Sequence, residues 1–115
     1  MSNNKSIRWM GSSKQDLRDF PKNAQRKVGF ELRAVQQGDE PSDSKSMPTI
    51  GKGVKEIRVR TRDAYRVFYV AKFDEAVYVL HTFQKKTQKT SKRDVQLGQQ
   101  RYKEMLRQRK EKGYS

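Results

Sequence analysis

The first third of the chain carries apolar side chains at the spacing of a helix. They recur at steps of three and four residues, at Leu17, Phe20, Ala24, Val28, Leu32 and Val35. This spacing places them on one helical face. Ser12 or Ser13 can cap the start, and Gly38 supplies a stop. Pro21 fits the first turn of a second helix better than the interior of one long helix, so we expect a helical hairpin over about residues 13–37.

The period of the pattern changes from 3.6 to 2 at Val54. Residues 55–62 alternate polar and apolar side chains, as a half-buried strand does. Two further runs, residues 65–73 and 76–84, are rich in Val, Tyr and Phe. The dipeptide Asp74-Glu75 between them predicts a tight turn. The sequence therefore predicts a three-stranded antiparallel meander.

Other segments complete the predicted organisation. Residues 1–5 read as a loose polar N-terminus, and residues 7–10 as a short strand. Residues 39–53 contain several Gly, Pro and Ser residues and predict a flexible connecting loop. Ser91 begins a capping box that opens a helix over about residues 92–111. The apolar stripe of this helix is weak, so we expect it to dock loosely.

These patterns predict one α+β domain over residues 1–115. An N-terminal helical hairpin packs on a small antiparallel β-sheet, and a C-terminal helix follows. The length of 115 residues is that of a single domain.

Two turn assignments decide which side chains share a face of the sheet. A three-residue loop over residues 62–64 sets Arg60 opposite Arg66, and a two-residue turn at 74–75 sets Arg66 opposite Phe83. One face then collects apolar side chains that can receive the hairpin: Ile57, Val59, Val67, Tyr69, Ala71, Tyr78 and Leu80. The other face collects cations and rings: Arg58, Arg60, Arg66, Phe68, His81, Phe83 and Lys85. A two-residue first loop would bury Arg66 unpaired among aliphatic side chains, which is costly.

Composition adds a strong positive charge to this picture. The chain has 27 Lys and Arg against 13 Asp and Glu, a net charge of +14. Residues 54–115 hold 17 of these basic side chains and 7 of the acidic ones. The bland interpretation of such a run is a solvated helical surface or an acidic protein partner. A polyanion is the partner that a chain this small and basic favours.

Several classes of protein and site are excluded. The absence of cysteine excludes disulfides and thiolate zinc sites, and it suits a reducing cytoplasm. A single histidine excludes a His-rich metal centre, and we expect neither metal nor cofactor. No apolar run approaches a membrane span, and the N-terminus lacks a signal-peptide stretch.

The cations on the second sheet face have a clear chemical use. Opposed arginines repel, and folding does not call for them. Guanidinium and ammonium groups hold phosphates, and interleaved aromatic rings stack unpaired bases. An ordinary solvent-facing strand is the alternative for Arg58 and Arg62, as a satisfied buried histidine is for His81. We expect contacts to RNA or the ribosome from Lys55, Arg62, Phe68, Phe83, Lys89, Lys92 and Arg93.

The order and spacing of four stretches resemble a known superfamily. They are Trp9–Lys14 (WMGSSK), Gly53–Arg58 (GVKEIR), Ala64–Tyr69 (AYRVFY) and Val77–Thr87 (VYVLHTFQKKT). The chain resembles the RelE/HigB/ParE toxins of bacterial toxin–antitoxin systems, most closely the phage-associated HigB-like branch, from Trp9 to about Arg107. The resemblance implies two helices on a small antiparallel sheet with a further C-terminal helix.

The resemblance also implies a reaction. RelE- and HigB-like toxins cut messenger RNA in the ribosomal A site without a metal, as the 2′-hydroxyl attacks the adjacent phosphate. Arg66 matches the catalytic arginine of the family's Tyr-Arg-x-x-Tyr pattern and would stabilise the phosphate. The other catalytic candidates by this resemblance are Arg58, Arg60, Lys85 and Lys86. His81 is the candidate general base, with Glu56 and Asp94 as alternatives.

Two other functions remain open, and a protein partner is implied. A ParE-like gyrase poison has the same fold without nuclease activity, and a basic RNA-binding module would bind without cutting. Toxins of this kind are neutralised by a cognate antitoxin, which in the HigB branch commonly carries a helix-turn-helix domain and contacts DNA itself. Its docking surface would be either the segment Lys85–Lys112 or the helical hairpin.

Overall fold

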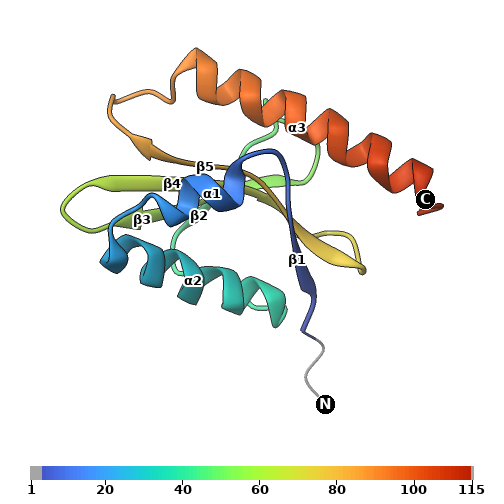
Figure 1. The fold of residues 1–115 in the computed structure, drawn as a ribbon, viewed down its shortest axis with the longest axis horizontal. Coiled ribbons are helices and arrows are strands. Elements are labelled where there is room, and N and C mark those ends of the chain that lie inside the picture. Colours follow the sequence, from blue (N-terminus) through green and yellow to red (C-terminus); the bar gives the residue numbers. More distant parts are fainter. Residues whose placement is uncertain (1–3, 115) are drawn as a thin grey trace.

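A five-stranded sheet with one long helix on each face forms the molecule (Figure 1). The computed structural model describes residues 4–114. In chain order the elements are β1 (Ser6–Trp9), α1 (Ser13–Arg18), α2 (Lys22–Gln36), β2 (Ser44–Ser46), β3 (Val54–Arg60), β4 (Ala64–Val70), β5 (Ala76–Lys85) and α3 (Lys92–Glu111). The strands lie side by side in the order β1-β5-β4-β3-β2. Strand β1 runs parallel to β5, and the other neighbouring pairs are antiparallel.

The predicted arrangement, a helical hairpin on a small antiparallel sheet, is wrong. The sheet is mixed and has five strands, because β1 joins β5 in parallel and β2 joins β3. The two N-terminal helices take different places. Helix α1 lies against β5, where the Ser13 hydroxyl donates to the Val79 carbonyl and the Thr82 hydroxyl donates to the Ser13 carbonyl. Helix α2 runs across one face of the sheet, where it contacts β3 and β5.

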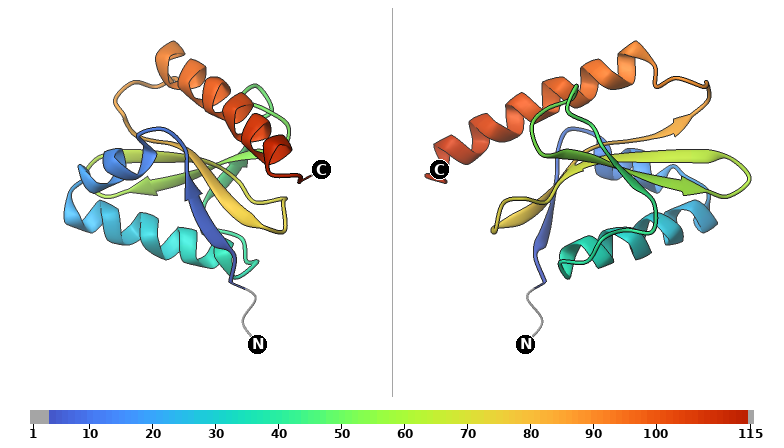
Figure 2. Two further views of the ribbon diagram at one scale, coloured as in Figure 1. Left: turned by 45° about the vertical axis from the view of Figure 1, so that its right-hand side comes forward. Right: turned by 180° about the vertical axis from the view of Figure 1, so that it is seen from behind.

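Helices α2 and α3 lie on opposite faces of the sheet (Figure 2), and each face carries its own apolar core. On the α2 side, the predicted stripe of Ala24, Val28, Leu32 and Val35 is buried. It packs with sheet side chains that include Ile57, Val59, Val67, Val77 and Val79. Burying each aliphatic side chain of this size stabilises the fold by about 1.5–3 kcal/mol. The alternation of apolar positions along the strands thus attaches α2 to the sheet.

The first hairpin has a register two residues away from the predicted one. Arg60 pairs with Ala64, not with Arg66, and Arg58 is the residue opposite Arg66. The connecting residues are 61–63, closed by a hydrogen bond from the Thr61 N–H to the Asp63 carbonyl at 2.9 Å. Because the shift is even, every β3 side chain keeps its predicted face. The predicted pairing of Arg66 with Phe83 is confirmed.

The second hairpin contains an irregularity that the sequence pattern did not predict. Residues 71–75 connect the strands, in place of a two-residue turn, and the register shifts between Phe68 and Tyr69. Opposite this point, the bulge puts Leu80 on the same side as His81. Leu80 and Tyr78 therefore belong to the α3-side core and not to the face covered by α2.

Helix α3 begins and ends as predicted but packs tightly rather than loosely. The Ser91 hydroxyl accepts the Asp94 N–H at 3.1 Å, which is the expected cap. A Cβ on Gly98 would lie only 2.9 Å from the Phe68 ring, so glycine permits the close approach of helix and sheet. Met105 is fully buried, and Arg109 forms an ion pair with Glu75 at 2.6 Å. The sheet face predicted to collect the cations and rings is therefore largely covered by α3.

Two segments predicted to be loose are held in place. The loop over residues 39–53 contains β2, and Glu31 accepts hydrogen bonds from the N–H and hydroxyl of Ser42. Of the predicted loose N-terminus, residues 1–3 lie outside the described residues. Lys5 donates its N–H to the Gln36 carbonyl and its ammonium to the Ala71 carbonyl. Among residues 4–114, no helix has the length and apolar character needed to cross a membrane.

Candidate functional site

Two arginines face each other on the α3 side of the sheet. Arg58 of β3 lies opposite Arg66 of β4, and Phe83 of β5 continues the row. Alternation along β3 puts Glu56 on the same side. A Glu56 carboxylate oxygen is 3.2 Å from Nε of Arg58 and 3.7 Å from Nε of Arg66. One buried carboxylate thus serves two guanidinium groups, and the Asp43 carboxylate also acts on Arg66 by raising its pKa.

Arg66 lacks a full set of hydrogen-bond partners. Its side chain is 13% exposed, and Nη1 donates to the Tyr65 carbonyl at 3.1 Å. Its Nε is buried and has no hydrogen-bond partner among the described residues. Burial lowers the pKa of Arg66, Glu56 raises it, and the charge of Arg58 lowers it again. Arginine nevertheless stays protonated at neutral pH. The charged guanidinium therefore has fewer hydrogen-bond acceptors than N–H donors, and a phosphate oxygen would supply a further acceptor.

The next row of paired residues adds further cations, at the end of β3, the start of β4 and the end of β5. Arg60 pairs with Ala64, which pairs with Lys85. Arg60 is exposed, Lys85 is half-buried, and the exposed Lys86 follows directly. The term cationic patch is used below for four side chains, Arg58, Arg60, Arg66 and Lys85. Strand alternation places all of them on the α3 side, beyond the first turns of that helix.

His81, the predicted general base, is buried and hydrogen-bonded at both ring nitrogens. It is 4% exposed, and its Nε2 lies 2.7 Å from a carboxylate oxygen of Asp94. Its Nδ1 lies 3.2 Å from Nη1 of Arg101. Because arginine only donates, Nδ1 is the acceptor and Nε2 carries the proton. Burial lowers the pKa of His81, although the Asp94 carboxylate raises it. The lowered pKa also favours the neutral ring. Both nitrogens are engaged within the protein, and neither is free to take a proton from a substrate.

The state of His81 predicts how stability depends on pH. In the unfolded chain the imidazole titrates near about 6.5, and in the fold its pKa is lower. Acidification below that value therefore protonates the unfolded chain first, and the free energy of unfolding should fall from pH 7.5 to pH 5.5. Urea unfolding of the wild type and of His81→Gln across this window measures the effect. The variant should show a shallower fall, and equal slopes would contradict the assignment.

The two predicted stacking rings lie inside the α3-side core. Phe68 has no exposed surface and Phe83 is 7% exposed. Their ring centroids are 5.1 Å apart, and Phe83 stacks on His81 at 4.8 Å. A base cannot stack on a ring face that is already covered. Both rings therefore pack within the core beside Arg66, and their contact with RNA stays a prediction.

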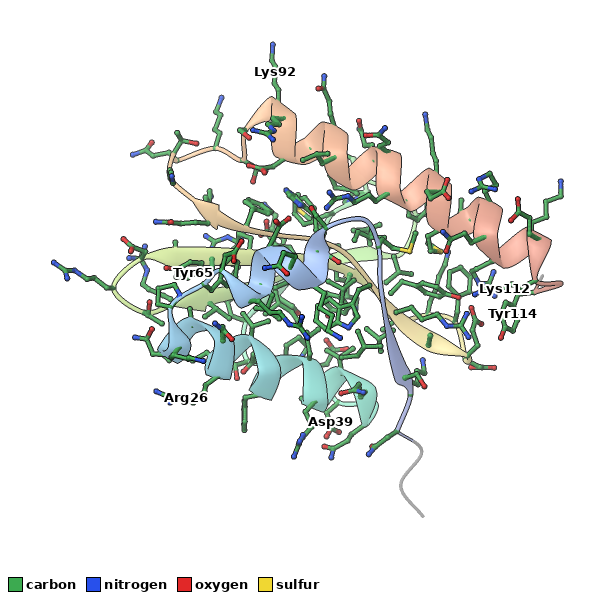
Figure 3. The ribbon with its side chains drawn as sticks, viewed as in Figure 1. Arg26, Asp39, Tyr65, Lys92, Lys112 and Tyr114 are labelled. Carbon is green, nitrogen blue, oxygen red and sulfur yellow. The ribbon has the colours of Figure 1, made fainter. Side chains whose placement is uncertain are left out.

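The remaining predicted contact residues are not gathered at one place. Lys55 lies near the other end of β3, where its ammonium is 3.5 Å from a Glu40 carboxylate oxygen. Arg62 is exposed in the tip of the first hairpin, and Lys89 is exposed in the loop before α3. Exposed side chains in the first turn of α3 include Lys92 and Arg93. Lys92 projects away from the sheet (Figure 3). Apart from Lys55, these residues surround the patch without joining it.

The sequence reasoning missed Arg101. Its guanidinium donates to the Leu80 carbonyl, to His81 and to the Ser12 hydroxyl. It lines a hollow of about 620 Å³ at the outer edge of β5, between α1 and α3. Asp94 and Arg101 are seven residues apart on one helix, a spacing that places them on the same helical face and could have indicated the pair. This network fixes the His81 ring and joins α3 to β5.

The described residues contain no group of three or more His, Asp or Glu side chains arranged to hold a metal ion. The patch itself is built from nitrogen donors, whose chemistry suits anions. By this chemistry the patch can bind an oxyanion.

One family of proteins matches this chain over most of its length. The family model described as phage-derived protein Gp49-like (DUF891) matches residues 15–103. The match runs from α1 into α3 and includes the whole cationic patch. A comparison with curated proteins gives no match.

Proposed function

Because this chain belongs to the Gp49-like family of phage-derived proteins, a toxin-like family related to RelE and HigB, we propose that it is a toxin that cuts messenger RNA. The toxin acts on the ribosome, without a metal, and arrests translation. A cognate antitoxin, encoded beside it, neutralises it. In the HigB-like branch that antitoxin commonly has a helix-turn-helix domain.

The incomplete bonding of Arg66 is the observation that carries the proposal. A buried guanidinium with an unused Nε donor, flanked by a second arginine and only one carboxylate, gains most from an incoming anion. Messenger RNA supplies a phosphate at every nucleotide. The scissile phosphate would accept from Arg66, with Arg58 and Arg60 around it.

The patch suits a reaction in which charge builds up on phosphorus-bound oxygens. The 2′-hydroxyl gives its proton to water as its oxygen attacks the phosphorus. A new P–O bond forms, the bond to the 5′-oxygen breaks, and the 5′-oxygen takes up a proton from solvent and leaves as a hydroxyl. Arg66 and Arg58 stabilise the negative charge of the pentacovalent state. Lys85 or Lys86 stabilises the departing 5′-oxygen. Glu56 holds the two guanidinium groups in place.

A basic RNA-binding module without catalysis is the second candidate. The observation that favours it is the engagement of both His81 nitrogens, which leaves the patch without a free imidazole base. Binding without cutting would need only the cations. The two candidates differ in whether a phosphodiester bond breaks.

A brief expression pulse in a bacterial host separates them. We expect growth arrest within minutes and new messenger 5′ ends concentrated inside translated codons. The same strain without induction gives the background of ordinary messenger RNA decay. Growth arrest without new 5′ ends would support the binding module, and harmless expression would contradict the toxin assignment.

A further inference from the structure

The outer edge of β3 is only partly paired. Strand β2 pairs with Lys55, Glu56 and Ile57, and the Arg58 N–H donates to the Asp43 carbonyl at 2.9 Å. Beyond that point no described strand lies beside β3. Backbone groups alternate in direction along a strand, so the N–H and carbonyl of Arg60 point outward, as those of Arg58 do. The Lys27 ammonium reaches the Arg60 carbonyl at 2.8 Å, which agrees with this direction.

A groove of about 600 Å³ lies between α2 and this edge. Its lining includes Arg26, Lys27, Phe30, Ser42, Arg58 and Arg60. Phe30 is 70% exposed, the largest exposed fraction among the bulky apolar side chains of the described residues. Arg26 projects outward from the same helix (Figure 3). The groove thus combines an unpaired strand edge, an exposed ring and several cations.

The charge of the groove points to an acidic occupant. The groove lining contains Arg26, Lys27, Arg58 and Arg60, and Glu31 is its acidic residue. Strand alternation directs the Arg58 and Arg60 side chains to the α3 side of the sheet, so Arg26 and Lys27 are the cations on the α2 side. Glu31 already accepts two hydrogen bonds from Ser42. Arg58 is paired with Glu56 at 3.2 Å, and the lining as a whole keeps a net positive charge. An extended peptide gains main-chain hydrogen bonds at a free strand edge, which a helix cannot use.

We propose that an extended acidic segment of the cognate antitoxin adds to β3 at Arg60, in the groove between β3 and α2, with an apolar side chain packed on Phe30. This inference rests on the proposed function and selects its docking surface. Arg58 and Arg60 belong both to the groove and to the cationic patch. The acidic segment would lie along the edge of the strand that carries these two arginines, and its carboxylates would pair with them around that edge in place of messenger RNA, which gives a direct route to neutralisation.

The test compares two matched double variants, each with one charge reversal and one loss of apolar surface. Lys27→Glu with Phe30→Ser alters the groove, and Lys110→Glu with Leu106→Ser makes the same changes on α3. All four side chains are exposed, so both variants should fold and stay toxic. When each is co-expressed with the protein of the adjacent reading frame, the α3 variant should be rescued as the wild type is. The groove variant should escape rescue and bind the purified antitoxin at least tenfold more weakly.

Hydrogen exchange on the wild-type complex adds a readout specific to strand addition. The Arg60 amide should exchange at least tenfold more slowly in the complex than in the free toxin. Normal rescue of the groove variant, or loss of rescue in the α3 variant, would overturn the docking site. An unprotected Arg60 amide would overturn strand addition. A wild type that arrests no growth would overturn the proposed function, and this inference with it, before any variant is compared.

Discussion

Arg66→Ala should abolish growth arrest and slow messenger cleavage by about a hundredfold or more, the usual loss when one preorganised donor to a transition-state oxyanion is removed. The substitution removes the charge that stabilises the phosphate, together with a side chain that is only 13% exposed and its 3.7 Å ion pair with Glu56. It also removes a buried Nε donor without a hydrogen-bond partner, which offsets part of that loss, so the protein should stay folded with a modest loss of stability. Single-turnover cleavage and urea unfolding of the same preparation measure both effects.

The matched control for this prediction is Arg33→Ala. Arg33 is exposed in the last turn of α2, and its loss changes the net charge by the same amount. We expect cleavage by the control within about twofold of the wild type, since isolated surface charges contribute little. Arg66→Lys should recover only part of the rate, because an ammonium lacks the planar fork of guanidinium. Cleavage by Arg66→Ala within a few-fold of the wild-type rate would remove Arg66 from the centre of the mechanism.

Phe68→Ala should lower the free energy of unfolding by about 3–5 kcal/mol, the usual cost of truncating a buried phenylalanine. Phe68 has no exposed surface and packs against Phe83 and against α3 at Gly98. Losing the ring would open a cavity beneath α3 and loosen the helix. Urea unfolding measures the change.

The matched control is the same substitution at an exposed ring. Phe30→Ala should change the free energy of unfolding by less than about 0.5 kcal/mol, because Phe30 is 70% exposed. Phe68→Leu nearly conserves volume and should cost less than about 1.5 kcal/mol. A stacking role for Phe68 predicts the opposite pattern, with normal stability and weakened RNA binding.

The elements that repeat a clear period were predictable, and their assembly was only partly so. The stripe of α2 and the cap of α3 at Ser91 both follow from local spacing. The parallel pairing of β1 with β5 joins segments about 70 residues apart and leaves no turn signal in the sequence. The bulge opposite Phe68 also has no local marker, yet it moves Tyr78 and Leu80 to the other core.

The candidate site was predictable as a set of charges and not as an arrangement. Face alternation alone puts Arg58, Arg60 and Arg66 together, and it survives a register error of two residues. Burial is a property of the assembled layers. The weak stripe of α3 gave no sign that Gly98 would bring the helix onto Phe68. The covering of His81 and its bond to Arg101 follow from that contact.

The chemistry at the cationic patch can be tested on its products. Purified toxin is mixed with ribosomes programmed with a defined messenger, and the new ends are read by mass spectrometry. Attack by the 2′-oxygen predicts a 2′,3′-cyclic phosphate on the upstream fragment and a 5′-hydroxyl on the downstream one. These ends should also form in the presence of a metal chelator that leaves the ribosomes intact. They should be absent when the toxin carries Arg66→Ala. Intact messenger beside tight, salt-sensitive RNA binding would contradict the nuclease assignment.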